Sequence, residues 1–273
     1  MQNKVWRLIY SAPESGPSNM AIDEAILEGV INKTIAPTLR FYSWCPYSLS
    51  IGHAQPISEV NLEFLKESGW DIVRRPTGGR AILHADELTY SVCAPLNGTQ
   101  VSGGVIESYR QISDCLLKAL ELCGVNADAK PKAEKDRSLS KDPVCFQIPS
   151  DYEITFGGKK IIGSAQARKA NGLLQHGAIP LFGDISRIIS TLNFNSEQHR
   201  SKAKSRLIAR ATTLRAAKNE LVSWEFLAQS IATAFKEILH IDFIQSSLSE
   251  EEVSRVETLL KEKYSNDSWT LRI

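Results

Sequence analysis

The chain has 273 residues, of which 42% are hydrophobic and 23% charged, enough apolar material for a globular core. Its 32 lysines and arginines nearly balance 31 aspartates and glutamates, so the net charge of +1 excludes an overall field that attracts nucleic acid or a membrane surface. The sequence lacks an apolar run of the roughly 18–20 residues that a membrane-spanning helix needs, and an apolar secretory segment near its start. We therefore expect a cytoplasmic globular protein.

The sequence contains five cysteines and five histidines. The cysteines are odd in number and follow no paired spacing, which is typical of reduced thiols rather than of a disulfide framework. The histidines do not have the spacing of metal ligands with a cysteine or a carboxylate. The sequence therefore predicts no metal site.

The N-terminal part of the chain predicts one long helix followed by short strands. Ser18 or Asn19 offers a side-chain oxygen that can cap a helix over residues 18–30. A short helix over residues 60–67 is expected to end at Gly69, because glycine adopts the left-handed conformation at low cost. Apolar runs bounded by turn residues predict strands over residues 39–44, 48–51, 71–75 and 89–94.

The central part predicts an amphipathic helix followed by a β-meander. Apolar residues at steps of three and four indicate a helix over residues 105–123. Gly157-Gly158 is typical of a two-residue hairpin turn, here between strands over residues 152–156 and 159–164.

Beyond about residue 184 the pattern is helical to the end, with a cap at Ser223 and a capping box over residues 249–252. Strands in the middle of the chain have helices before, between and after them. This order predicts an α+β fold: a mixed, mostly antiparallel sheet packed by helices, with a helical C-terminal segment.

Residues 74–80 form an arginine- and glycine-rich loop, Arg-Arg-Pro-Thr-Gly-Gly-Arg. Gly78 and Gly79 let backbone N–H groups approach a ligand closely, and the flanking arginines suit an anionic or carbonyl-bearing one. The spacing is not that of a phosphate-binding loop or a dinucleotide fingerprint. A glycine-rich turn with solvated arginines is the alternative interpretation.

Cys145 is the cysteine whose surroundings favour reactivity. It follows a charged segment over residues 130–142, and nearby cations favour the thiolate. Cys115 and Cys123 instead occupy the apolar face of the predicted helix and are expected to be core residues. From the residues alone, Cys145 is either a nucleophile or an inert thiol.

The predicted hairpin carries two lysines directly before Gly163-Ser164-Ala165. Regular alternation places Lys160 on the face of Ser164 and Lys159 on the face of Gly163. A lysine held against the sheet there can contact a carbonyl or a thiolate, whereas lysines at a hairpin tip are more often solvated.

His84 and His176 each lie beside one of these segments, so we expect them to line one cleft. Residues 199–215 form a locally basic stretch, which is either a solvated helix face or a docking patch.

These segments resemble the lipoate–protein ligase and octanoyltransferase family, most closely its octanoyltransferases of Gram-positive bacteria. The resemblance runs from Trp6-Arg7 almost to the C-terminus, and the motifs keep their order and spacing. They occupy residues 19–25, 39–42, 74–80, 87–92, 144–146, 152–153, 163–166 and 174–177.

The resemblance implies the catalytic domain shared by biotin and lipoate protein ligases, of the class II aminoacyl-tRNA synthetase type. We expect this domain over residues 33–243, with the helix over 18–30 packed on it. A C-terminal helical extension is expected over residues 244–273, and the family suggests a monomer.

The resemblance further implies an acyl transfer through the enzyme, with no cofactor. The family's nucleophilic cysteine falls on Cys145 and its lysine on Lys160, a choice between adjacent lysines that the residues alone leave open. Octanoyl would pass from octanoyl-acyl carrier protein through a Cys145 thioester to a lysine of a lipoyl domain, that of the glycine cleavage H protein. The candidate substrate-binding residues are Arg75, Gly78, Gly79, His84, Gly163, Ser164, Ala165 and His176.

Three other activities remain open. Lipoate–protein ligases activate free lipoate with ATP and typically carry a third glycine and a His-Asp-x-Gly-Asn motif, where this chain has Arg80 and His84-Ala85-Asp86-Glu87-Leu88. The family's amidotransferases move octanoyl from the H protein to other lipoyl domains and keep the cysteine. A non-enzymatic binder of acyl groups or lipoyl domains is the third.

Overall fold

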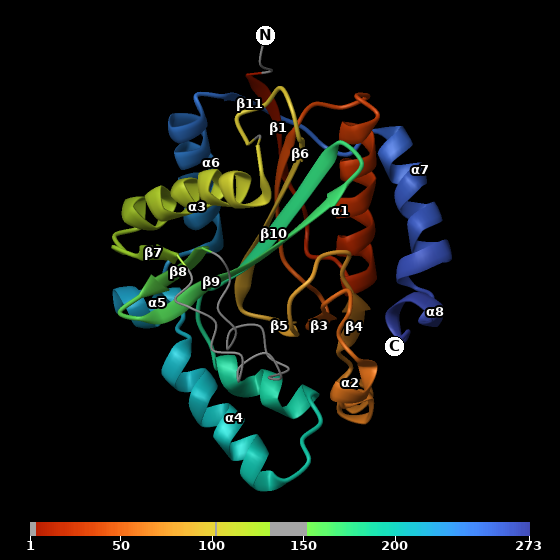
Figure 1. Ribbon diagram of the computed structural model, residues 1–273, viewed down its shortest axis with the longest axis vertical. Coiled ribbons are helices and arrows are strands. Elements are labelled where there is room, and N and C mark those ends of the chain that lie inside the picture. Colours follow the sequence, from red (N-terminus) through yellow and green to blue (C-terminus); the bar gives the residue numbers. More distant parts are fainter. Residues whose placement is uncertain (1–3, 102, 132–151) are drawn as a thin grey trace.

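A main sheet of eight strands forms the centre of the computed structural model, which describes residues 4–101, 103–131 and 152–273 (Figure 1). In spatial order its strands are β11 (Asp242–Gln245), β1 (Val5–Tyr10), β2 (Thr38–Tyr42), β6 (Glu87–Pro95), β10 (Gly172–Pro180), β9 (Lys159–Lys169), β8 (Tyr152–Phe156) and β7 (Asp128–Pro131). β1 pairs in parallel with β11 and β2, and the other neighbouring strands of this sheet pair antiparallel.

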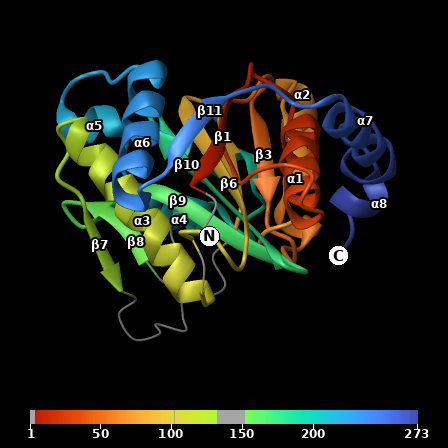
Figure 2. The ribbon, with the colours of Figure 1, turned by 90° about the horizontal axis from the view of Figure 1, so that it is seen from above.

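Helices cover both faces of this sheet (Figure 2). α3 (Val105–Leu122) and α6 (Trp224–Leu239) pack together over one face, where Phe41, Tyr90 and Phe235 join the largest core cluster. α1 (Gly16–Ile31) covers the other face, and α7 (Glu250–Leu259) packs on the outer side of α1. The expected α+β fold with a mixed, mostly antiparallel sheet packed by helices is confirmed.

A second, smaller sheet lies beside α1 and consists of β4 (Asp71–Arg74), β3 (Ser48–Ile51) and β5 (Ile82–His84). It shares a core cluster with η4 (Ile185–Thr191) and with α4 (Glu197–Arg210), which projects at the lower end of Figure 1. α4 carries most of the expected basic stretch. The remaining short elements are η1 (Ile57–Glu59), α2 (Leu62–Ser68), α5 (Leu214–Lys218), η5 (Leu260–Tyr264) and α8 (Asp267–Thr270).

Local signals account for several element boundaries. Gly69 ends α2 at φ +64°, in the left-handed region that favours glycine. The Ser223 hydroxyl accepts a hydrogen bond from the Phe226 amide at the start of α6, and Ser249 and Glu252 cap α7 reciprocally. These predicted caps are confirmed.

Local patterns miss the short strands β1, β5, β7 and β11. β5 lies between the predicted strands over residues 71–75 and 89–94, and β11 lies in a segment expected to be helical throughout. β11 exists because it pairs in parallel with β1 from the other end of the chain, a partner that no local pattern encodes. The expected domain boundary at residue 243 passes through this strand. Among the described residues, no helix is both long and apolar enough to cross a membrane.

We expect Ser223→Ala to lower the free energy of unfolding by about 1 kcal/mol, because the Phe226 amide loses the oxygen that caps α6. Urea unfolding measures this difference. Ser223→Asp keeps a capping oxygen and serves as the control, with stability close to that of the wild type. Equal stability of Ser223→Ala and the wild type would contradict the capping role.

Candidate active site

A buried ion pair between Asp23 on α1 and Arg40 on β2 joins the helix to the main sheet. Both side chains are fully buried, and Arg40 Nη1 lies 2.8 Å from Asp23 Oδ1. Asp23 also accepts hydrogen bonds from Ser91, Tyr42 and His176. Burial alone raises the pKa of Asp23, but the hydrogen bond from His176 and the charge of Arg40 bring it below its ordinary value. The carboxylate is therefore ionised, and four donors satisfy it.

His176 on β10 is held between Asp23 and the arginine–glycine loop. Its Nδ1 lies 3.3 Å from Asp23 Oδ2, and its Nε2 lies 2.7 Å from Thr77 Oγ1. Because Asp23 is ionised, Nδ1 carries the proton and Nε2 accepts from the Thr77 hydroxyl. Burial lowers the pKa of His176, although Asp23 opposes this shift. The ring is therefore neutral, and both its nitrogens are occupied.

His84 on β5 is fixed in the same way. Its Nδ1 lies 2.5 Å from Glu87 Oε1 and its Nε2 lies 2.7 Å from Ser50 Oγ, which accepts in turn from Arg75 Nη1 at 2.9 Å. The ring stacks on Trp44 with a centroid distance of 3.8 Å. A continuous line of hydrogen bonds thus joins the charges of Arg75 and Glu87.

Arg75 uses its guanidinium to hold its own loop. Nη1 donates to the carbonyl and the hydroxyl of Ser50, and Nη2 donates to the carbonyls of Gly78 and Arg80. These four bonds match the four hydrogens on the two Nη atoms. In contrast to the sequence-based expectation, these donors serve the protein, and Arg75 acts by shaping the wall of the site.

Arg74 is fully buried and clamps the same loop to two distant segments. Its Nη1 donates to the carbonyls of Gly52, His53 and Gln55. Its Nε and Nη2 donate to the carbonyls of Trp269, Thr270 and Arg272, near the end of the chain. The loop over residues 74–80 is therefore fixed from behind by the segment that follows α7.

A narrow cavity lies between α1, the small sheet and the main sheet. Small residues of β9 and β10 line it on the sheet side, where Gly177 presents only its backbone. The opposite wall carries larger side chains. A narrow, mainly apolar slot with a few fixed polar groups suits a short aliphatic chain. Its lining includes Met20, Tyr42, Trp44, Ile82, Thr89 and Ala178.

β9 contains a bulge directly after Lys160. Thr155 pairs with Lys160 but Ile154 pairs with Ile162, so Ile161 is an extra residue. Ile161 and Ile162 both enter the largest core cluster, and two successive side chains on one face shift the alternation by one residue.

The bulge places Lys160 on the face of the narrow cavity, opposite the core. Its side chain is 2% exposed, and its Nζ lies 3.1 Å from Glu153 Oε1. Glu153 precedes the core residue Ile154 and so lies on the same side of the sheet as Lys160. The expectation that Lys160 shares a face with Ser164 is wrong, because regular alternation does not hold across a bulge.

Most of the candidate substrate-binding residues meet at the narrow cavity. Arg75, His84, Gly163, Ala165 and His176 all line it, and the expectation that the two histidines share a cleft is confirmed. The polar side chains among them, Arg75, His84 and His176, already bond to other groups of the protein and shape the wall of the cavity.

The other candidates lie elsewhere. Ser164 points to the opposite face of β9, where its Oγ lies 2.8 Å from the Tyr90 hydroxyl. Gly78 and Gly79 line a wide, open cleft beside the narrow cavity. Cys145 lies outside the described residues.

Sequence reasoning missed several residues that build this site. Asp23 had a usable signal, because α1 is buried on nearly every side and an aspartate in such a helix requires a partner. Trp44 carried no local signal, because it stacks on His84 from a segment 40 residues away. Glu87 and Glu153 lie in two of the family motifs, but their partners His84 and Lys160 become evident only from the fold.

Comparison with known proteins assigns the chain to a family. Residues 15–236 match the lipoyl protein ligase A/B catalytic domain. The chain belongs to this family. It is 38% identical over 270 residues to the octanoyltransferase LipM of Carboxydothermus hydrogenoformans, with 98% of this chain and 99% of that relative covered. It is 36% identical over 277 residues to the octanoyltransferase LipM of Bacillus cereus, with 100% of both chains covered.

Solved structures share the fold along the whole chain. One belongs to the archaeal lipoylation system of Thermoplasma acidophilum, a bipartite lipoate protein ligase and its E2 lipoyl domain; its TM-score is 0.79 at 26% identity, covering 99% of this chain and 96% of that one. A lipoate-protein ligase A bound with ATP gives a TM-score of 0.78 at 26% identity and covers 99% of both chains. The expected ligase-type fold is therefore confirmed.

The buried His176 predicts a pH dependence of stability. Because burial holds its pKa below the ordinary 6.5, the unfolded chain binds more protons at this residue once the pH falls below 6.5. We therefore expect the free energy of unfolding to fall as the pH drops from about 7.5 to about 5.5. Urea unfolding of His176→Gln, which can still pair with Asp23 and Thr77, should show a shallower slope. The exposed His199→Gln is the control, and an unchanged slope in His176→Gln would refute the assignment.

Proposed function

We propose that the chain transfers an octanoyl group from octanoyl-acyl carrier protein to a lysine of a lipoyl domain, that of the glycine cleavage H protein, through a thioester on Cys145. Its family and its likeness over the whole chain to octanoyltransferases make it an acyltransferase of protein lipoylation. The observation that supports transfer through Cys145 and Lys160 is the narrow apolar cavity. Gly163 and Ala165 line it, and Lys160 lies on the same face of β9 as these two residues.

In the first half-reaction, a thiolate at Cys145 attacks the thioester carbonyl of the donor. The Lys160 ammonium favours this thiolate by opposite-charge attraction. Glu153 keeps the buried ammonium paired in the absence of the thiolate. Exchange of one thioester for another is nearly balanced in free energy, so an acyl-enzyme forms without ATP.

Ser164 is the candidate oxyanion donor. The Tyr109 hydroxyl donates to the Ser164 carbonyl at 3.0 Å, whereas the Gly163 carbonyl points toward β10. In an antiparallel strand the N–H of a residue points to the same side as its carbonyl, so the Ser164 N–H also points away from β10. A donor of this kind contributes about 3–4 kcal/mol to transition-state stabilisation.

In the second half-reaction, the lysine amine of the lipoyl domain attacks the acyl-enzyme. A C–N bond replaces the C–S bond, and conversion of a thioester to an amide is downhill. The narrow cavity holds the aliphatic chain through both steps, so the same carbonyl carbon is presented to the thiolate and then to the amine.

Donor and cofactor requirements separate the rival activities. A lipoate–protein ligase would use free octanoate with ATP and would tolerate Cys145→Ala. An amidotransferase would accept octanoyl-H protein as the donor in place of octanoyl-carrier protein. Arg80 stands where ligases carry a third glycine, and its guanidinium lies 3.3 Å from Glu59. These features favour the transferase.

We expect the chain to gain the mass of one octanoyl group at Cys145 when it is mixed with octanoyl-acyl carrier protein, as measured by intact-mass spectrometry. Cys145→Ser should abolish transfer and leave the thermal unfolding curve unchanged, because the two side chains are nearly isosteric. Cys45→Ser removes an exposed thiol of the described part of the chain and should transfer normally. Substantial transfer by Cys145→Ser would refute the nucleophile, and absence of the adduct would favour a binder.

Lys160→Ala should shift the pH midpoint of Cys145 alkylation by iodoacetamide upward by about one unit, because the thiolate loses a neighbouring positive charge. Lys159→Ala is the matched control: the Lys159 ammonium donates to the Ile208 carbonyl at an exposed position. Labelling profiles that coincide for Lys160→Ala and the wild type would show that Lys160 does not tune the thiol.

A further inference from the structure

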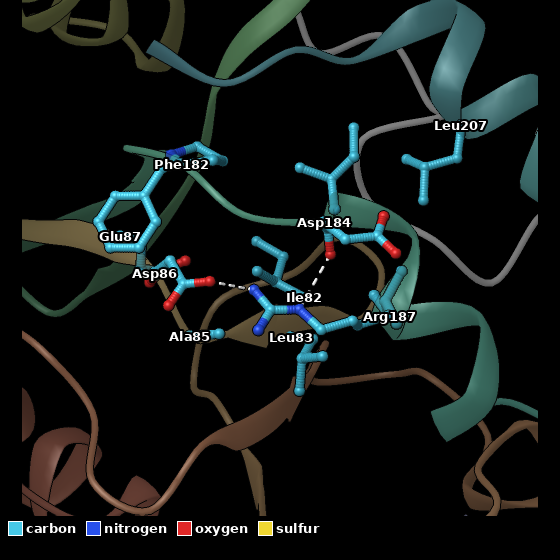
Figure 3. Close-up of a pocket in the computed structure, with 12 residues that line it drawn as sticks. Ile82, Leu83, Ala85, Asp86, Glu87, Phe182, Asp184, Arg187 and Leu207 are labelled. Carbon is cyan, nitrogen blue, oxygen red and sulfur yellow. Dashed lines mark hydrogen bonds and ion pairs between the residues drawn. The ribbon is translucent and has the colours of Figure 1, made fainter. Parts of the chain in front are cut away.

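A second cavity lies next to the narrow cavity, between β5, β6, η4 and α4 (Figure 3). Ile82 lines both cavities, so the two share a wall. The second cavity has mainly aliphatic walls that include Pro180, Ile188 and Leu207, and the exposed ring of Phe182 also lines it. Its shape and lining suit an aliphatic side chain.

Glu87 connects the two cavities. Its side chain is 4% exposed, and it lines the second cavity while it bonds to His84 of the narrow one. Among the described residues, its hydrogen bonds from His84 Nδ1 at 2.5 Å and Thr89 Oγ1 at 2.6 Å both end on Oε1. Oε2 takes part in neither bond. Because Glu87 lines the second cavity, its carboxylate is an acidic group that a ligand there can meet.

Among the residues that line this cavity, acidic groups outnumber basic groups. Arg187 pairs with Asp86, and Figure 3 shows it lying between Asp86 and Asp184. Hydrogen bonds from Ser186 lower the pKa of Asp184, so this carboxyl group is ionised. Asp86 and Arg187 cancel, and Lys204 on α4 opposes the charge of Asp184. Glu87 is therefore the carboxylate that favours a cation in this cavity and opposes a phosphate.

We propose that the second cavity receives the acceptor lysine of the lipoyl domain, with its aliphatic stem against Ile82 and Pro180 and its ammonium on Glu87 Oε2. This inference rests on the proposed acyl transfer and deepens it. It supplies the route by which an amine reaches an acyl group held on the other side of Ile82.

The transfer balances with the groups that are present. The ammonium loses one proton to the Glu87 carboxylate, and the nitrogen lone pair forms a C–N bond to the acyl carbon. The C–S bond to Cys145 breaks, and its electron pair stays on sulfur. The second N–H proton passes to that sulfur, and Glu87 returns its proton to solvent. The products are the amide, the Cys145 thiol and one released proton.

Narrowing the cavity tests this route in a single turnover. Ala85 lines the second cavity and is half-buried, so Ala85→Phe fills space there without entering the narrow cavity. We expect octanoyl transfer from the acylated enzyme to the apo lipoyl domain to slow at least about tenfold. Hydroxylamine, a small nucleophile that needs no lysine site, should release octanoyl at the wild-type rate. Ala216→Phe makes the same replacement at an exposed position of α5 and should transfer normally. Wild-type transfer by Ala85→Phe would overturn the proposal.

Direct binding gives a readout that needs no acyl-enzyme. Nα-acetyl-lysine methylamide should shift the isoleucine methyl resonances of Ile82 and Ile188 in ¹³C-labelled protein, and Glu87→Gln should weaken this binding about tenfold or more. The uncharged norleucine analogue is the matched control ligand and should bind less tightly than lysine. Failure of the lysine analogue to shift these methyl groups, or stronger shifts with AMP, would overturn the proposal. Absence of the Cys145 adduct would instead overturn the proposed transfer and leave this binding result to stand by itself.

Discussion

The buried ion pair between the Asp23 carboxylate and the Arg40 guanidinium joins α1 to the main sheet beside the narrow cavity. Asp23 and Arg40 are both fully buried, and each is costly to bury without the other. Their pairing fixes α1 on the main sheet, and the remaining acceptor positions of Asp23 orient Tyr42, Ser91 and His176. The position of the narrow cavity between α1 and the sheet depends on this pair.

The two histidines of the narrow cavity, His84 and His176, have the same arrangement of hydrogen bonds. Each ring has its Nδ1 beside a buried carboxylate and its Nε2 beside a hydroxyl group, which fixes the orientation of the ring. Arg74 and Arg75 are similarly occupied by carbonyl groups of the chain. The hydrogen bonds of these polar residues thus hold the walls of the narrow cavity in place, and the surface left to line it is mainly apolar.

Short-range chemistry made much of the fold predictable. The caps at Ser223 and Ser249, the left-handed Gly69 and the Gly157-Gly158 hairpin depend on neighbouring residues, and all were expected from the sequence. β11 was not, because its pairing with β1 joins opposite ends of the chain. The same holds for the site. The strand with Gly163-Ser164-Ala165 was expected from the sequence, whereas the stacking of Trp44 on His84 was not.

The face of Lys160 was predicted wrongly because one extra residue, Ile161, enters the strand without a pairing partner. With regular pairing, Lys159 would lie toward the slot and Lys160 toward the core. A single inserted position therefore selects which of two adjacent lysines serves the cavity. A sequence alignment that ignores this extra residue would therefore place the two lysines on the wrong faces of β9.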